Sequence, residues 1–143
     1  MVLELSIEIR HNRTNEMNLL GGIGVQTLHK MTASTAVRIR VGDIKVFGPG
    51  IAELLERIDR CESIRTAAME MHIAYSKAWT MLRSCEEALG FPLIERKVGG
   101  SNGGGSSLTK EGRDLLQRYR QWETNCKEFA RNNLAELFPG EAE

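Results

Sequence analysis

The amino-acid sequence predicts a mainly α-helical fold that carries one small β-hairpin. Three observations support this. Apolar residues recur with the helical period in several segments, a glycine-rich stretch separates two short strand-like segments, and one helical pattern near the C-terminus continues for about 26 residues.

Length and composition narrow the class of protein. The 143 residues suit one compact domain, and 19 basic side chains balance 19 acidic ones. No apolar run approaches the ~20 residues that span a bilayer. No signal-peptide pattern opens the chain, so we expect a soluble cytoplasmic protein. Cys61, Cys85 and Cys126 lack metal-ligand spacing, and we interpret them as free thiols rather than a metal or redox site.

The first half of the chain divides into an extension and the start of a domain. Residues 1–9 alternate apolar and polar side chains, but no hairpin signal follows, so we expect residues 1–35 to be a loosely ordered extension. Residues 37–47 read as a strand segment with a bend at Gly42 and Asp43. After Pro49, apolar residues at the i, i+3, i+4 and i+7 positions predict a helix over residues 51–61.

Two further helices and a hairpin follow. Ser63 is a good N-cap for a short helix that runs to residue 71, and a third helix runs from residue 75 or 76 to 88, where Gly90 and Pro92 end it. Residues 91–98 read as a strand, residues 99–107 as a glycine-rich loop and Ser107 with Leu108 as a returning strand. Glu86 and Glu87 read as a solvated pair.

A long helix closes the pattern. Thr109 is its expected N-cap, and its apolar stripe is longer than a small domain needs for its own core, which predicts a partner helix and a dimer. The expected interface residues are Leu115, Tyr119, Trp122, Cys126 and Phe129. We therefore expect one domain over residues 36–138, which includes this helix, and a tail over residues 139–143.

The order of helix, short helix, turn, longer helix and hairpin is that of a winged helix-turn-helix. In this arrangement a helix enters the major groove and the hairpin, or wing, lies on the neighbouring backbone. Basic residues outnumber acidic ones by eight to five between Tyr75 and Arg120, a modest local surplus. The side chains expected to contact duplex DNA are Ser63, Tyr75, Ser76, Lys77, Thr80, Arg83, Arg96, Lys97, Ser101, Asn102 and Thr109.

Other chemistry finds little support in the residues. Trp79 fits packing between the third helix and the wing better than base stacking. The glycine-rich loop lacks the G-x-x-x-x-G-K-[ST] order of a nucleotide-phosphate cradle. We find no catalytic arrangement and no metal or cofactor site, and so expect no enzyme.

Two stretches resemble a known family. Residues 62–80 resemble the helix-turn-helix of ModE-type, molybdate-responsive regulators, roughly S-I-S-x-A-A-K-x-x-G-[IM]-S-Y-K-x-A-W. The matching residues are Ser63, Ile64, Ala67, Ala68, Ile73, Tyr75, Lys77, Ala78 and Trp79. Residues from Leu93 onward resemble that family's wing, L-V-E-R-x-x-G-G-x-x-G-G-G-x-x-L-T-x-x-G. LysR-type regulators have a similar winged domain without this glycine-rich wing.

The resemblance covers residues 37–137. It implies a homodimer joined through the last helix, with Ser76 and Lys77 reading bases and Arg96, Lys97 and the wing tip holding phosphate. His72, or Ala74 if the turn shifts, stands where the family has a turn glycine. The family's C-terminal oxyanion-binding region has no counterpart in these residues, so we expect no molybdate site in them. The alternative is a winged-helix protein–protein interaction module that does not bind DNA, which the balanced net charge favours.

Overall fold

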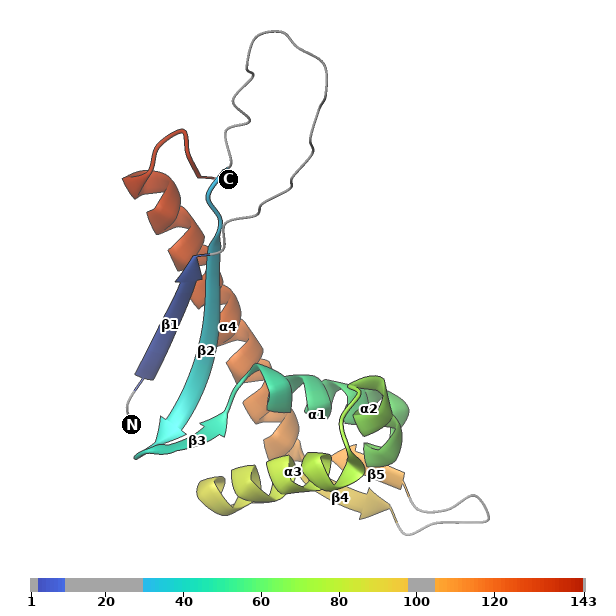
Figure 1. The fold of residues 1–143 in the computed structure, drawn as a ribbon. Coiled ribbons are helices and arrows are strands. Elements are labelled where there is room, and N and C mark those ends of the chain that lie inside the picture. Colours follow the sequence, from blue (N-terminus) through green and yellow to red (C-terminus); the bar gives the residue numbers. More distant parts are fainter. Residues whose placement is uncertain (1–2, 10–29, 98–104, 143) are drawn as a thin grey trace, which may run out of the picture.

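The computed structural model describes residues 3–9, 30–97 and 105–142. Five strands and four helices follow one another in these residues (Figure 1). Their order is β1 (Leu3–Ile9), β2 (Ala33–Val41), β3 (Ile44–Phe47), α1 (Pro49–Cys61), α2 (Ile64–Glu70), α3 (Tyr75–Leu89), β4 (Ile94–Lys97), β5 (Gly105–Leu108) and α4 (Lys110–Leu137). The predicted helices and hairpin are all present, and the fold is a winged helix-turn-helix with a long C-terminal helix.

An antiparallel sheet of order β1-β2-β3 precedes the helices. Residues 3–9, expected to be loosely ordered, form β1, in which Leu5 pairs with Val37 of β2. The expected boundary after residue 35 falls inside β2. The alternating pattern of residues 1–9 was a genuine strand signal, but the partner strand lies far along the chain, so no local hairpin signal accompanied it. The rest of the expected extension, residues 10–29, lies outside the described residues.

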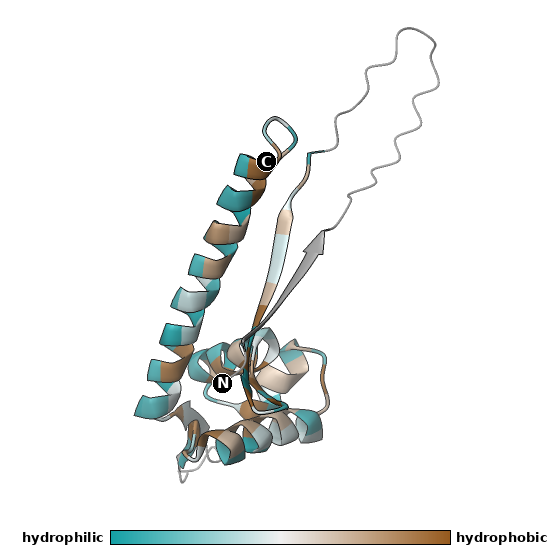
Figure 2. Cartoon of the chain, turned by 90° about the vertical axis from the view of Figure 1, so that its left-hand side faces the viewer, coloured by the Kyte–Doolittle hydropathy of each residue, from teal (hydrophilic) through white to brown (hydrophobic). Residues whose placement is uncertain are grey.

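The long helix α4 runs beside β2 and extends well beyond the other helices (Figures 1 and 2). Its 28 residues correspond to a length of about 42 Å. Tyr119 joins the two elements, since its ring is buried and its hydroxyl donates a hydrogen bond to the Val37 carbonyl at 2.8 Å. Beyond the far end of α4, the Met31 amide donates to the Glu141 carbonyl at 2.6 Å, which brings the residues after α4 to the start of β2.

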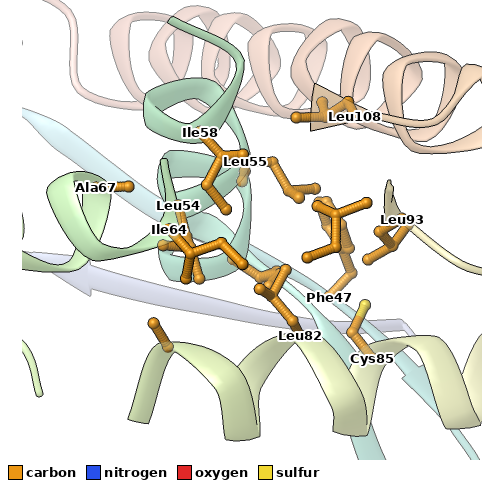
Figure 3. Packing of buried hydrophobic residues seen from close by; sticks show 14 of the residues in the cluster. Phe47, Leu54, Leu55, Ile58, Ile64, Ala67, Leu82, Cys85, Leu93 and Leu108 are labelled. Carbon is orange, nitrogen blue, oxygen red and sulfur yellow. The ribbon is translucent and has the colours of Figure 1, made fainter. Parts of the chain in front are cut away.

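One hydrophobic core lies where α1, α3, β3 and the base of the wing meet (Figure 3). The apolar positions of α1 that the sequence predicts to face inward are buried, and α3 contributes a buried face of its own. The largest fully buried side chains besides Tyr119 are Phe47, Leu54, Leu55, Ile58, Leu82 and Leu93. This core holds α3 from behind and leaves its opposite face toward solvent.

The turn between α2 and α3 depends on a left-handed residue. His72 has φ of 54°, the conformation that glycine adopts most readily. The Ile73 amide then donates to the Ala68 carbonyl at 3.0 Å, and the chain enters α3. His72 therefore stands at the turn position where the ModE-type family has glycine, and it adopts the left-handed conformation itself. Buried Ala67, Ala68 and Ala78 leave room for α2 and α3 to approach closely.

Polar contacts fix the base of the wing to its neighbours. The Glu86 carboxylate accepts hydrogen bonds from the Leu93 and Ile94 amides at 2.8 and 3.3 Å. On the other strand, the Ser106 amide donates to the Glu62 carbonyl at 2.8 Å. The interpretation of Glu86 as half of a solvated pair was wrong, because its carboxylate ties the last turn of α3 to β4.

Candidate nucleic-acid interface

The first two turns of α3 present a polar, basic face to solvent. Tyr75, Ser76, Lys77, Thr80 and Arg83 are all exposed, whereas Ala78, Leu82 and Cys85 on the opposite face are buried. The Thr80 hydroxyl donates to the Ser76 carbonyl at 3.0 Å and can still accept a hydrogen bond from a ligand. These five predicted DNA-contacting residues therefore lie together on one accessible surface.

The wing adds one described cation to this surface. Arg96 is exposed in β4, and its guanidinium lies 4.9 Å from the centre of the half-buried Trp79 ring. Trp79 thus packs between α3 and the wing, as the sequence predicted. The side chain of Lys97, together with Ser101 and Asn102, lies outside the described residues.

Two predicted DNA-contacting residues also cap helices. The Ser63 side chain caps α2, since its oxygen accepts from the Thr66 amide at 3.2 Å. The Thr109 hydroxyl accepts from the Gly112 amide at 3.0 Å and donates to the Pro92 carbonyl at 2.8 Å, which caps α4 and closes the end of the wing. These capping bonds give both side chains a structural role, and their contact with DNA stays a prediction.

Arg65 also belongs to this surface, although the sequence analysis did not predict it. It is exposed on α2, and its guanidinium lies 5.1 Å from the centre of the Tyr75 ring. The available signal was the pattern of α2, in which Ile64, Ala67 and Ala68 face inward and the polar position between them faces outward.

Ion pairs among the described residues concentrate on α1 and the first half of α4, although Arg118 and Arg131 of α4 make none. Arg120 binds Glu56 at 2.7 Å, Arg57 binds Glu53 and Glu70 at 2.6 and 3.0 Å, Arg60 pairs with Glu70, and Arg113 pairs with Asp59. Among the described residues, Arg65, Lys77, Arg83 and Arg96 make no ion pair. A chain with no net charge therefore keeps uncompensated cations on the α3 and wing surface.

The predicted dimer residues separate into two groups. Tyr119 is 1% exposed and serves the core of its own chain, so we correct its assignment as an interface residue. Leu115, Trp122 and Cys126 are half-buried, and Phe129 is 70% exposed. Leu137 and Phe138 are also exposed near the end of α4, which leaves apolar side chains in water on its far half.

The described residues give no support for a metal site or a membrane-spanning helix. Within residues 3–9, 30–97 and 105–142, no group of His, Cys, Asp and Glu side chains could hold a metal ion. In the same part of the chain, no helix is long and apolar enough to cross a membrane. Burial, reinforced by the nearby Glu86 carboxylate, raises the pKa of the Cys85 thiol to about 12, so this cysteine is a poor nucleophile.

Comparison with known proteins identifies the class of domain. Residues 52–113, from the first turn of α1 to the first turn of α4, match the family model described as bacterial regulatory helix-turn-helix protein, lysR family. This part of the chain is therefore similar to the helix-turn-helix domain of bacterial regulatory proteins.

Three ModE proteins are similar to this chain over part of its length. The chain is 41% identical to the transcriptional regulator ModE of Haemophilus influenzae over 71 residues, which cover 50% of this chain and 28% of that protein. It is 33% identical to the molybdenum transport protein ModE of Azotobacter vinelandii over 67% of this chain and 33% of that protein. It is 35% identical to the DNA-binding transcriptional dual regulator ModE of Escherichia coli K12 over 50% of this chain and 27% of that protein. The chain therefore spans no more than about a third of these relatives, and the ModE-like and LysR-like resemblance read from the sequence is confirmed for its helix-turn-helix domain.

Proposed function

We propose that the protein is a sequence-specific, DNA-binding transcription regulator that binds duplex DNA as a homodimer. The observation that supports this most is that Lys77, Arg83 and Arg96 lie exposed on the face of α3 and the wing and make no ion pair among the described residues. A duplex-DNA partner implies action in the cytoplasm, where bacterial DNA lies. We propose no catalytic role.

In the proposed complex, the first two turns of α3 enter the major groove. Ser76 and Lys77 read base edges there, and Thr80 and Arg83 lie further along the same exposed face. Arg96 and the glycine-rich wing hold the phosphate backbone beside the groove. The buried face of α3 fixes the angle at which these side chains meet the DNA.

The second half of α4 supports the dimer. Its exposed Phe129 and Leu137 are 70% and 65% accessible, an arrangement that a second copy of the helix would remove from water. A two-fold dimer places two recognition helices on half-sites about 34–36 Å apart, one turn of the duplex. The expected operator is therefore a pseudo-palindrome.

The test of DNA binding is fluorescence anisotropy with the protein's own upstream DNA and with scrambled duplex, each at several salt concentrations. We expect tighter binding to the native fragment and a steep fall in affinity with salt, because phosphate contacts release counterions. Weak binding that is equal for both duplexes and insensitive to salt would reject the proposal. It would favour the protein–protein interaction module.

Lys77→Ala tests base reading within this assay. We expect a roughly 5- to 150-fold loss on the specific site and a weaker preference over scrambled DNA, from the ~1–3 kcal/mol that a good base contact contributes. Lys45→Ala removes another exposed lysine, from β3, and is the matched control. An equal loss on all duplexes would reduce Lys77 to a phosphate contact.

Phe129→Glu tests the dimer. A carboxylate in the middle of the exposed apolar stripe should produce monomers in sedimentation equilibrium. Thr124→Glu adds the same charge at an exposed position about 140° around the helix and should leave the dimer intact. An unchanged dimer in Phe129→Glu would refute α4 as the interface.

A further inference from the structure

Four side chains form a continuous row across the proposed DNA-binding face. Arg65 of α2 lies 5.1 Å from the Tyr75 ring, and the Tyr75 and Trp79 rings meet edge to face with centroids 6.2 Å apart. Arg96 of the wing lies 4.9 Å from the Trp79 ring. The row therefore links the helix before the recognition helix, the recognition helix itself and the wing.

The row places a guanidinium at each end and two aromatic rings between them. A guanidinium stacked on a ring uses its face, while its N–H donors point outward from its edge. Those edge donors fit the oxygens of a phosphodiester in a bidentate contact. Because neither Arg65 nor Arg96 makes an ion pair among the described residues, no carboxylate of this chain competes for them there.

We propose that Arg65 and Arg96 are paired phosphate-contacting residues on either side of the recognition helix, and that Tyr75 and Trp79 are positioning residues that hold them. The inference rests on the proposed function and assigns it a contact, Arg65, that lies outside both α3 and the wing. Their common ligand is the phosphodiester backbone of duplex DNA, not a base edge. Tyr75 and Trp79 lie one helical turn apart on α3, so the spacing of the two guanidinium groups follows from the helix.

The salt dependence of DNA affinity distinguishes residues that contact phosphate from residues that position them. In the anisotropy assay, Arg65→Met and Arg96→Met should each weaken binding to native and scrambled duplex alike. Each should also lower the slope of log affinity against log salt by about one per protomer. Arg131→Met removes an exposed arginine from the far half of α4 and should leave the slope unchanged. A slope unaffected by Arg65→Met would overturn the assignment of Arg65.

Double-variant cycles test whether Tyr75 and Trp79 position the two arginines. Trp79→Leu should weaken binding about 2- to 5-fold, the value of an exposed cation–aromatic contact, and this loss should vanish in a protein that already carries Arg96→Met. Tyr75→Leu should show the same dependence on Arg65. Losses that add fully in both double variants would overturn the positioning role. If Trp79→Leu lowers helicity in circular dichroism, Trp79→His replaces it in the same cycle.

A measurement without DNA keeps this inference separate from the proposed function. The chain has two tryptophans, so Trp122→Phe leaves Trp79 as the sole reporter. Adding Arg96→Met should then shift the Trp79 emission in the free protein, and an unchanged emission would refute the stacking. Failure of the unmodified protein to bind DNA would instead refute the proposed function.

Discussion

A substitution at Gly112 tests how closely α4 packs against the wing. Gly112 is the third residue of α4, and a Cβ atom added there would lie 3.1 Å from the carbonyl carbon of Leu93 and closer still to its oxygen. The same Leu93 oxygen accepts a hydrogen bond from the Thr109 amide at 3.0 Å. The added Cβ would meet backbone atoms that are already hydrogen-bonded, and moving them would cost free energy.

Two opposing effects set the expected result of Gly112→Ala. Alanine is favoured over glycine within a helix by about 1 kcal/mol. Overpacking costs about 1–3 kcal/mol, and loss of the Thr109 to Leu93 hydrogen bond adds about 1 kcal/mol. The steric cost exceeds the helical preference, and we expect the free energy of unfolding to fall by about 1–3 kcal/mol.

Gly50→Ala is the matched control. Gly50 is the second residue of α1, and a Cβ there would meet only the Met81 methyl group, at an ordinary 3.7 Å. Urea unfolding of the two variants at equal protein concentration should show Gly50→Ala unchanged or more stable and Gly112→Ala less stable. A Gly112→Ala protein as stable as the unmodified chain would refute the close packing of α4 against Leu93.

The remaining predictions concern the turn and the buried thiol. His72→Gly should raise the free energy of unfolding by about 0.5–1 kcal/mol, because it relieves the left-handed conformation at the cost of a more flexible unfolded chain; equal or lower stability in urea would contradict this. Cys85 should resist a thiol reagent at pH 8 until the protein unfolds, since its pKa is raised to about 12, while half-buried Cys61, outside the proposed dimer interface, reacts in the folded state. Mass spectrometry of the labelled peptides distinguishes the three sites, and early labelling of Cys85 would show that its burial is incomplete.

Local patterns were enough to predict most of the helical part of the fold. The i, i+3, i+4 spacing of Ile51, Leu54, Leu55 and Ile58 located α1, and Ser63 and Thr109 located the starts of α2 and α4. These signals depend on residues within one or two helical turns of each other. The pairing of β1 with β2 depends on residues about thirty positions apart, such as Leu5 and Val37, and the period of either strand alone does not name its partner.

The site was predicted less completely than the fold. Exposure of Ser76, Lys77 and Arg83 follows from the helical period of α3, so these positions could be chosen from the sequence. Tyr119 belongs to the same periodic stripe as Phe129, and periodicity cannot tell which part of a stripe faces the chain's own β2. The cation–aromatic row could not be found either, because its members come from α2, α3 and β4.

The two ends of α3 have different roles, because the Glu86 carboxylate in its last turn holds the first strand of the wing. The bonds of this carboxylate to Leu93 and Ile94 are made from the last turn of α3, whereas Ser76 and Lys77 lie in the first turn. Exchanging the exposed Ser76, Lys77 and Thr80 therefore leaves both the Glu86 bonds and the packing of Trp79 against the wing untouched. If the protein binds DNA as proposed, the domain is thus suited to acquiring new operator preferences, by selection or by engineering, while the distance between helix and wing stays constant.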